Sequence, residues 1–275
     1  MAAKFKPSML NRTPEQVAVH LAICHKLPFT ITNKRVKGWS FIRENIPGNN
    51  EYKIEMRAFE TITPTDIVNL IGAVKVFQDH RCNVQEDVLG NDKMLTVEID
   101  FYLFLRDYST HKSKHDMIET LKRLSSFQVF YHMRDGAKLM ERYLYNFEIS
   151  SNEKNVKFII SEKFYELCTK NTWLINYSKL RSLNSQTAKA LFLYISGNLR
   201  NDFYQSTLEF WLDMKNETSA QQRDNRVKLK SAFKELIAAK VISKYEYDPN
   251  SKKFILRRGK SSHNKKTEII YNAIQ

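Results

Sequence analysis

The feature that most constrains this chain is a basic helical stretch followed at once by two basic strands, between Gln222 and Lys260. In the helical part, apolar residues recur at helical spacing and predict one buried stripe: Leu229, Phe233, Leu236 and Ile237. Cations three and four residues apart predict an outward face on the same helix: Arg223, Arg226, Lys230 and Lys234. The helix therefore has one side for a core and another for a partner.

Two strands and a turn complete this stretch. Val241 to Tyr247 alternates like a half-buried strand, Asp248-Pro-Asn-Ser is a turn signal, and Lys252 to Arg258 returns as the second strand. A basic helix followed by a basic hairpin is typical of a winged helix. In that fold the helix enters the major groove of DNA, and the hairpin, or wing, lies along the flanking backbone.

The net charge also favours a polyanionic partner. The 275 residues include 44 Lys and Arg against 30 Asp and Glu, a formal net charge of +14. This excess favours nucleic acid, and the alternative is a merely basic protein. The length suits two small domains, and 42% apolar residues are enough to form a core. With 7 Gly and 6 Pro, the composition argues against disorder and against a many-turned β-sandwich.

The cysteines and the hydropathy indicate a cytoplasmic protein. Cys24, Cys82 and Cys168 are odd in number and lack CxxC spacing, which argues against a structural zinc site and suits a reducing compartment. The start of the chain, Met1-Ala-Ala-Lys-Phe-Lys, lacks the apolar run of a signal peptide. No stretch approaches the roughly 18 apolar residues that a membrane span needs, so we expect no membrane association.

The first half predicts an arm and then a mixture of helices and strands. In the arm, Thr13-Pro14 resembles a helix start, and residues 29–41 suit a strand or an extended strap. Residues 81–93 read as a polar loop. The expected strands cover 52–59, 95–99, 128–132, 143–149 and 156–160, the last three as wing strands, and the expected helices cover 66–79, 100–107, 113–125 and 162–168.

The second half repeats the order of the first. Helical patterns at 177–183, 186–197 and 206–214 precede the opening stretch, and residues 118–130 parallel residues 230–242. Each half thus has a long apolar helix, a short helix, a basic helix and a hairpin. We expect an α+β fold of two tandem winged-helix domains with an N-terminal arm: 1–50 arm, 51–170 first domain, 171–260 second domain and 261–275 basic tail.

Several segments in this order resemble a known family, the replication initiators of iteron-bearing plasmids. In the first half, Thr63-Pro-Thr-Asp66, residues 97–105 and residues 118–124 are similar to the TrfA type. In the second half, residues 177–194 and 229–236 are similar to the family's Leu-Tyr helix and its C-terminal recognition helix. The resemblance spans roughly residues 50–260. The polar insert at 81–93 and the Ala238-Ala-Lys end of the last helix depart from the pattern, which leaves the subfamily open.

The resemblance implies a function in origin binding. Such initiators bind direct repeats, the iterons, as monomers through both domains, help to open an A+T-rich stretch, and bring in the host initiator and the replicative helicase. Their dimers act as a brake or bind an operator. The alternative is a sequence-specific transcription regulator, an autorepressor, with the same domains. A regulator of that kind needs an inverted repeat and a dimer, whereas the initiator meets direct repeats.

Basic residues of the two expected wing-and-helix units are the candidate DNA contacts. Arg can grip guanine at two atoms, whereas Lys mostly meets phosphate. In the second half they are Arg223, Arg226, Lys228, Lys230, Lys234, Lys252, Lys253, Arg257 and Arg258. In the first half they are Lys114, His115, Lys122 and Arg123, which we place away from the buried face of their helix. The basic run from Lys252 to Lys266 adds phosphate contacts, or merely a solubilising end.

The sequence gives no sign of catalysis, and we expect no enzyme activity, no cofactor and no metal. A nicking endonuclease needs a His-apolar-His pair and a nucleophilic Tyr, and the seven His residues form no such pair. His111 and His115 are four apart, but no third metal ligand stands out beside them. No GxxxxGK[ST] phosphate loop is present, so ATP hydrolysis is excluded as well.

Overall fold

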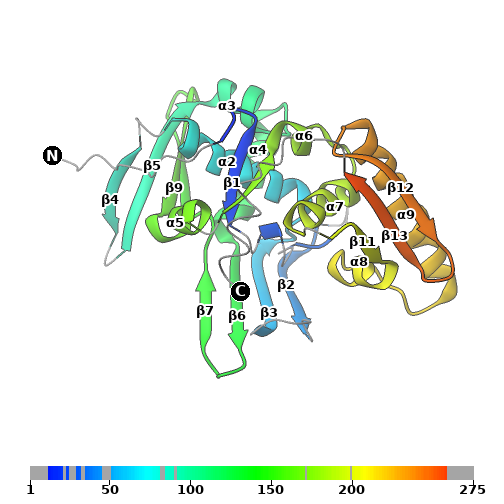
Figure 1. Ribbon diagram of the computed structural model, residues 1–275. Helices are drawn as coiled ribbons and strands as arrows, with labels where there is room; N and C mark the ends of the chain where they lie inside the picture. The colour runs from blue at the N-terminus through cyan, green and yellow to red at the C-terminus, as the bar shows by residue number, and fades with distance from the viewer. Residues whose placement is uncertain are drawn as a thin grey trace.

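The computed structural model describes residues 12–20, 23–24, 29–31, 35–44, 51–80, 84–89, 92–170, 172–198 and 200–258. The architecture is α+β, as the sequence predicts (Figure 1). Within the described residues, the strands form four antiparallel sheets. Two of these sheets belong to units with the same order of elements.

The first unit comprises residues 64–161. Its repeated elements are α2 (Pro64–Asp79), β5 (Asp92–Asp100), α3 (Phe101–Tyr108), α4 (Lys114–Ser126), β8 (Asn146–Ile149) and β9 (Asn155–Ser161). The last strand, β9, lies between β5 and β8, so these three strands have the spatial order β5-β9-β8. The expected helices at 66–79, 100–107 and 113–125 are confirmed as α2, α3 and α4.

The second unit comprises residues 186–258 and lies at the opposite side of the molecule from the first (Figure 1). Its elements are α7 (Gln186–Gly197), β11 (Asp202–Tyr204), α8 (Gln205–Trp211), α9 (Ser219–Ala238), β12 (Ile242–Asp248) and β13 (Lys253–Arg258). The last strand is again central, in the order β11-β13-β12. Both units therefore run helix, strand, two helices and a pair of strands, with the same strand in the middle.

A capping box sets the start of α9. The Thr218 hydroxyl accepts a hydrogen bond from the backbone N–H of Gln221 at 3.2 Å, and the Gln221 side chain accepts one from the backbone N–H of Thr218 at 3.0 Å. These two bonds satisfy N–H groups that a helix start leaves unpaired. The helix therefore begins at Ser219, earlier than the expected start at Gln222.

A separate sheet combines two strands that precede α2 with two strands that lie between α4 and β8. It consists of β2 (Lys37–Glu44), β3 (Glu51–Glu60), β6 (Gln128–Met133) and β7 (Lys138–Glu141), in that spatial order. The assignment of residues 128–132 to a wing is therefore wrong, because β6 pairs with β3 and not with β8 or β9. In this pairing Val129 lies opposite Met56, and Tyr131 lies opposite Ile54. All four side chains are buried on one face of the sheet. Figure 1 shows this sheet projecting below the two units.

The expected helix at Thr13 is also wrong. Thr13 begins a turn, in which its carbonyl accepts a bond from the Gln16 N–H at 2.9 Å, and β1 (Gln16–His20) follows. Val17 and Val19 are fully buried in this strand, where β-branched residues pack well. One partner of β1 is β10 (Thr172–Asn176), a strand that the sequence did not predict. The segment of the expected arm thus lies against the link between the units.

The remaining differences concern short or polar strands. The expected loop at 81–93 contains β4 (Gln85–Leu89), which pairs with β5; its sequence Gln-Glu-Asp-Val-Leu carries little strand signal. The strands β7 and β11 were not expected, and β8 is shorter than the predicted 143–149. The helices at 162–168 and 177–183 are confirmed as α5 (Glu162–Lys170) and α6 (Tyr177–Ser182).

The first unit makes close polar contacts with α6 and with the second unit. The Tyr177 hydroxyl of α6 donates to the carbonyl of Tyr108 at 2.6 Å in the buried interior. Gly72 of α2 permits this approach, because a Cβ at that position would overlap the Tyr108 carbonyl. Lys189 of α7 donates to the Thr65 hydroxyl of α2 at 2.9 Å. One apolar core includes residues of both units, and the expected domain boundaries at 50, 170 and 260 stay predictions.

Candidate nucleic-acid interface

The helix α9 presents a basic outer side, as predicted. Leu229, Phe233 and Leu236 are fully buried, and Ile237 is half-buried against the same core. The side chains of the opposite side are exposed or half-buried: Arg223, Lys228 and Lys234 are exposed, whereas Arg226 and Lys230 are half-buried. Among the described residues, no hydrogen bond or ion pair engages Lys228 or Lys234. These two ammonium groups are available to phosphate.

Arg226 and Lys230 are half-buried because both lie over the ring of Tyr247 in β12. The Arg226 guanidinium carbon is 4.9 Å from the ring centroid, and the Lys230 ammonium is 5.3 Å from it. The Nε of Arg226 also donates to the side-chain oxygen of Gln205 at 3.2 Å. Cation–π contacts of this kind attract the charge to the ring face. The helix and the hairpin are thus linked through two of the predicted DNA contacts.

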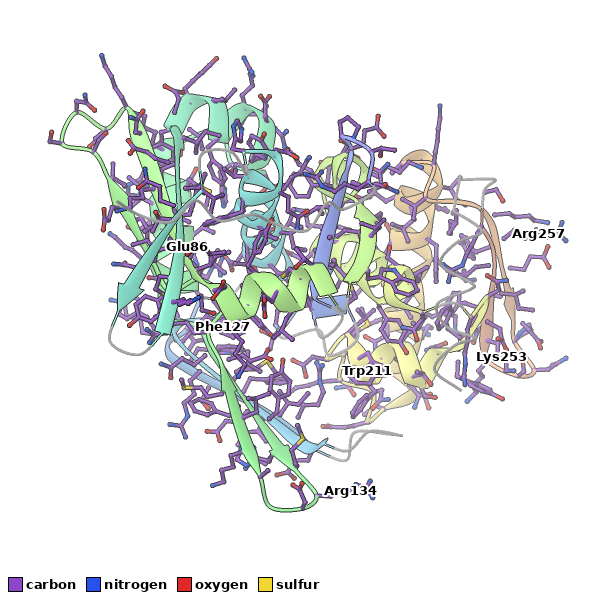
Figure 2. All side chains as sticks on the ribbon, turned by 60° about the vertical axis from the view of Figure 1, so that its left-hand side comes forward. Glu86, Phe127, Arg134, Trp211, Lys253 and Arg257 are labelled. Atoms are coloured by element: carbon purple, nitrogen blue, oxygen red, sulfur yellow. The ribbon has the colours of Figure 1, made fainter. Side chains whose placement is uncertain are left out.

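The strands β12 and β13 carry the predicted wing residues in three different environments. Lys252 lies exposed at the turn with φ at +50°, and Arg257 is exposed on the outer side of β13 (Figure 2). Lys253 forms an ion pair with Asp202 at 3.0 Å and lies 4.4 Å from the Tyr204 ring. The hydrogen bond to Asp202 raises the pKa of Lys253, which keeps its charge.

Arg258, a predicted DNA contact, binds several groups within the protein. Its guanidinium donates to Asn201 Oδ1 at 3.0 Å and to the carbonyls of Ile195 and Arg200 at 3.2 and 2.8 Å. It also donates to the carbonyl of Asn198. These carbonyls lie at and just after the end of α7, where a helix leaves acceptors unpaired. Burial lowers the pKa of Arg258.

In the first unit, two of the predicted DNA contacts on α4 are bound to other groups of the protein. Lys114 donates to the carbonyl of Glu153 and lies 5.6 Å from the Phe101 ring. His115 is exposed. Lys122 is exposed but forms an ion pair with Glu119 at 2.7 Å, one turn earlier on the helix. The outer side of α4 therefore offers less unpaired positive charge than that of α9.

Arg123 lies inside the molecule, and its predicted place on the outer side of α4 is wrong. Only 7% of the residue is exposed. Its guanidinium binds Asp66 at 3.0 Å, Glu60 at 3.2 Å and the Thr120 hydroxyl at 2.8 Å. Arg35 binds the same Asp66 carboxylate at 2.7 Å. Because a buried cation of this kind is satisfied by its carboxylates, it is not available to DNA.

Neither a metal site nor a membrane span is found in the described part of the chain. His111 precedes α4, so it does not share a helix face with His115, and its Nε2 lies 2.9 Å from the Thr120 hydroxyl. Burial lowers the pKa of His111. Within the described ranges, no three His, Cys, Asp or Glu side chains are grouped to hold a metal ion. No helix there is long and apolar enough to cross a membrane.

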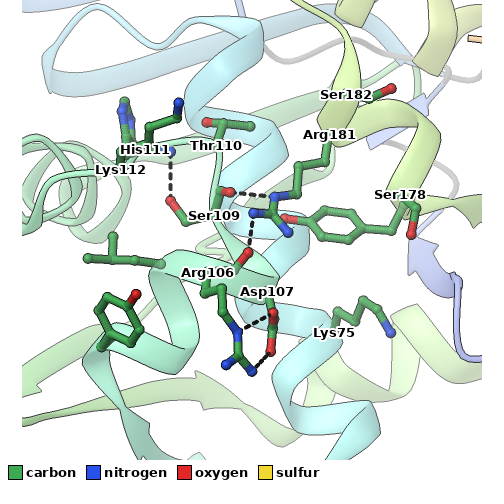
Figure 3. A pocket seen from close by; sticks show the side chains of 13 residues that line it. Lys75, Arg106, Asp107, Ser109, Thr110, His111, Lys112, Ser178, Arg181 and Ser182 are labelled. Carbon is green, nitrogen blue, oxygen red and sulfur yellow. Dashed lines mark hydrogen bonds and ion pairs between the residues drawn. The ribbon is translucent and has the colours of Figure 1, made fainter.

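A hollow of about 640 Å³ lies where α3 meets α6 (Figure 3). Arg181 of α6 crosses it and donates to the carbonyls of Ser109, at 2.5 Å, and Arg106. Arg106 itself forms an ion pair with Asp107 at 2.7 Å. Two of the cations in the hollow are therefore engaged within the protein, and Arg181 holds α6 against the first unit. This contact joins residues about 70 positions apart, so no local pattern predicts it.

Two residues of the site escaped sequence reasoning. Tyr247 lies in a predicted strand but is not among the predicted DNA contacts. Its spacing of two from Tyr245 does place both rings on the same face of that strand. Gln205, which starts α8, carries no sequence signal at all. Both are found only when α8, α9 and β12 come together in the fold. The tail after Arg258, including Lys260, Lys265 and Lys266 of the predicted basic run, lies outside the described residues.

Comparison with known proteins supports the fold. No family model matches the chain, and no curated protein sequence matches it. Among solved structures, it is similar to the crystal structure of selenomethionine derivatives of domains 2 and 3 of RctB. The TM-score is 0.56 at 13% identity, over 79% of this chain and 86% of that chain. The match must include parts of both units, and at this identity it is a likeness of fold.

Proposed function

We propose that this chain is a replication initiator that binds double-stranded DNA through two winged-helix units, residues 64–161 and 186–258. The observation that carries the proposal is the repeated order of helix, strand, two helices and two strands, with the last strand central in each sheet. This is the arrangement expected of a winged helix, in which the third helix enters the major groove. RctB, whose domains 2 and 3 share the fold, is itself a replication initiator.

The charge distribution supports DNA as the partner. The proposed contacts of the second unit are Arg223, Arg226, Lys228, Lys230, Lys234, Lys252, Lys253 and Arg257. Those of the first unit are Lys114, His115 and Lys122. Arg123 and Arg258 are left out because their guanidinium groups are engaged inside the protein. Phosphate contacts by the Lys residues would make binding strongly dependent on salt.

The proposed action is binding and deformation of DNA without covalent chemistry. Two units on one chain would cover a site of about two helical turns and meet direct repeats as a monomer. Strain on the adjacent duplex would help it to open. Recruitment of the host initiator and helicase, a monomer–dimer equilibrium and a cytoplasmic location complete the proposal. The recruitment and the self-association rest on the family resemblance, and the location rests on the cysteines and the hydropathy.

Footprinting of the full chain on the DNA beside its gene tests this function. We expect protected direct repeats, each about two helical turns long. Arg223→Ala should weaken the protection, whereas Lys163→Ala, at an exposed position of α5 outside the proposed contacts, should leave it unchanged. Protection of a single inverted repeat would instead indicate the transcription regulator. Absence of any protected site would contradict both.

A further inference from the structure

Gln205 is a buried amide at the centre of the second unit. It starts α8, and only 4% of the residue is exposed. Its amide nitrogen donates to Glu209 at 2.7 Å and to the carbonyl of Gln222 in α9 at 2.8 Å. Both protons of the amide are therefore used, one within α8 and one on the helix that carries the basic residues.

The amide oxygen of Gln205 is used on the other side. It accepts from the Nε of Arg226 at 3.2 Å and from the hydroxyl of Tyr247 at 3.1 Å. An amide rotated by 180° would point an N–H at the Nε–H of Arg226, and its oxygen at the Glu209 carboxylate and the Gln222 carbonyl. The four contacts therefore fix one orientation of Gln205, and they tie α8, α9 and β12 together.

Glu209 stabilises this orientation of the Gln205 amide. It is only 2% exposed, and its carboxylate accepts from Asn216 at 3.2 Å and Asn225 at 3.3 Å in addition to Gln205. Amide donors satisfy the oxygens of this buried carboxylate, as a buried charge requires. Because Glu209 can only accept, it selects the N–H side of Gln205 and leaves the oxygen of Gln205 for Arg226.

The consequence for Arg226 is a guanidinium with a fixed direction. Its Nε is bound by Gln205, and one face of the group lies on the Tyr247 ring. Among the described residues, no hydrogen bond engages its two terminal nitrogens. A planar fork with two free donors, held by its inner nitrogen, matches the O6 and N7 acceptors of guanine in the major groove. Less entropy is lost on binding when the group is held beforehand.

We propose that Arg226 reads a guanine and that Gln205 is the positioning residue that aims it. This proposal rests on the proposed DNA-binding function and deepens it, because it assigns base recognition to one residue of α9. Lys228 and Lys234, which have no comparable anchor, contact phosphate. Gln205 does not touch DNA itself. Its role is to keep the fork of Arg226 in the direction that two-point contact requires.

The test uses the full chain and a duplex selected by it from a random-sequence pool. Each guanine of that duplex is replaced in turn by 7-deazaguanine, which lacks the N7 acceptor but keeps base pairing. We expect one replacement to weaken wild-type binding by about 5- to 150-fold. Arg226→Ala should bind the normal and the replaced duplex alike.

Gln205→Met separates positioning from folding. Met keeps the length and the burial but lacks the acceptor, so discrimination at the same guanine should fall to nearly none. The dependence of binding on salt should stay as in wild type, because the phosphate contacts remain. Tyr247→Phe keeps the ring, removes one bond to Gln205 and serves as a second variant if Gln205→Met does not fold.

Three results would overturn the proposal. If Gln205→Met and Tyr247→Phe both keep full discrimination, Gln205 does not position Arg226. If no 7-deazaguanine replacement affects wild-type binding, Arg226 does not read guanine, although DNA binding still stands. If the full chain enriches no duplex from the pool, the proposed function fails and the inference fails with it.

Discussion

The two units use opposite charges to hold the third helix against the start of the first. In the first unit, the cation is on the third helix: Arg123 of α4 binds Asp66 in the first turn of α2. In the second unit, the carboxylate is on the third helix: Glu235 of α9 accepts from the N–H and the hydroxyl of Ser185, the N-cap of α7, at 3.1 and 2.7 Å. Either way, a carboxylate lies at the positive end of the first helix.

This comparison teaches that residue type alone does not place a charge on a recognition surface. When the ends of α4 and α9 are aligned, Arg123 and Glu235 occupy the same position. Lys122 and Lys234, one residue earlier, correspond in the same way, and both are exposed. The position of a residue relative to the first helix therefore decides whether it faces the protein or the solvent.

The largest expected effect is the loss of the buried cation. Arg123→Ala should lower the free energy of unfolding by about 3–5 kcal/mol, because it leaves Asp66 and Glu60 partly uncompensated. Lys122→Ala, the exposed neighbour, should stay within about 0.5 kcal/mol of wild type. Urea unfolding followed by circular dichroism measures both. Equal stability of the two variants would mean that Arg123 has no structural role in the first unit.

The second expected effect is on the stability of the protein at low pH. Burial alone raises the pKa of Asp66, but hydrogen bonding and charge from Arg35 and Arg123 outweigh burial and bring the pKa below its ordinary value of 3.8. A carboxyl whose pKa is lowered on folding stabilises the fold above its ordinary pKa, and this contribution is lost as the pH falls through the folded-state pKa. Urea midpoints between neutral pH and pH of about 2 should fall less in Asp66→Asn than in wild type. Parallel curves would contradict this.

The third effect measures the difference between the outer sides of α4 and α9. Replacement of Arg223, Lys228 and Lys234 by Ala should lower the slope of log K against log salt by about 2.7 if each meets one phosphate. The α4 variant His115→Ala/Lys122→Ala should lower it by less than about 1, because Lys122 is paired with Glu119. Fluorescence anisotropy over a salt series gives both slopes. Equal slopes would show that the units share the DNA evenly.

The smallest effect tests the contact of Glu235. Glu235→Ala removes the acceptor for the Ser185 hydroxyl and N–H, and it should cost about 0.5–2 kcal/mol of stability, as the loss of a helix cap does. The partly exposed setting makes this cost lower than that of Arg123→Ala. Glu235→Gln keeps an acceptor and should recover part of the loss. A loss in Glu235→Ala as large as in Arg123→Ala would break the contrast between the units.

The long helices could be read from the sequence because their signals are local. Ser185 and Ser113 are capping residues before an apolar stripe, and both cap a helix. Thr218 also caps a helix, but the polar turn that follows it hides this start. The strands were harder to assign. Nothing local in residues 128–132 indicates that β6 pairs with β3 and not with β8 or β9. That choice depends on Met56 and Ile54, more than 70 residues earlier.

The residues of the candidate site also fall into two groups, those that local spacing predicts and those that depend on distant contacts. The exposed cations Lys228 and Lys234 follow from helical spacing against Leu229 and Phe233, because burial on a helix is periodic. The burial of Arg123 does not follow, because its partner Asp66 lies 57 residues away. The same holds for Gln205, which becomes part of the site only through contacts with other elements.

The pairing of β1 with β10 has a consequence for how the protein is made. His20 lies opposite Thr172 and Gln16 opposite Asn176, a separation of about 150 residues or more. During translation, β1 leaves the ribosome long before this partner exists, and chains are made at about 5–20 residues per second. For several seconds, the backbone groups of β1 that later pair with β10 therefore have no partner strand. β1 therefore completes this backbone pairing long after its own synthesis.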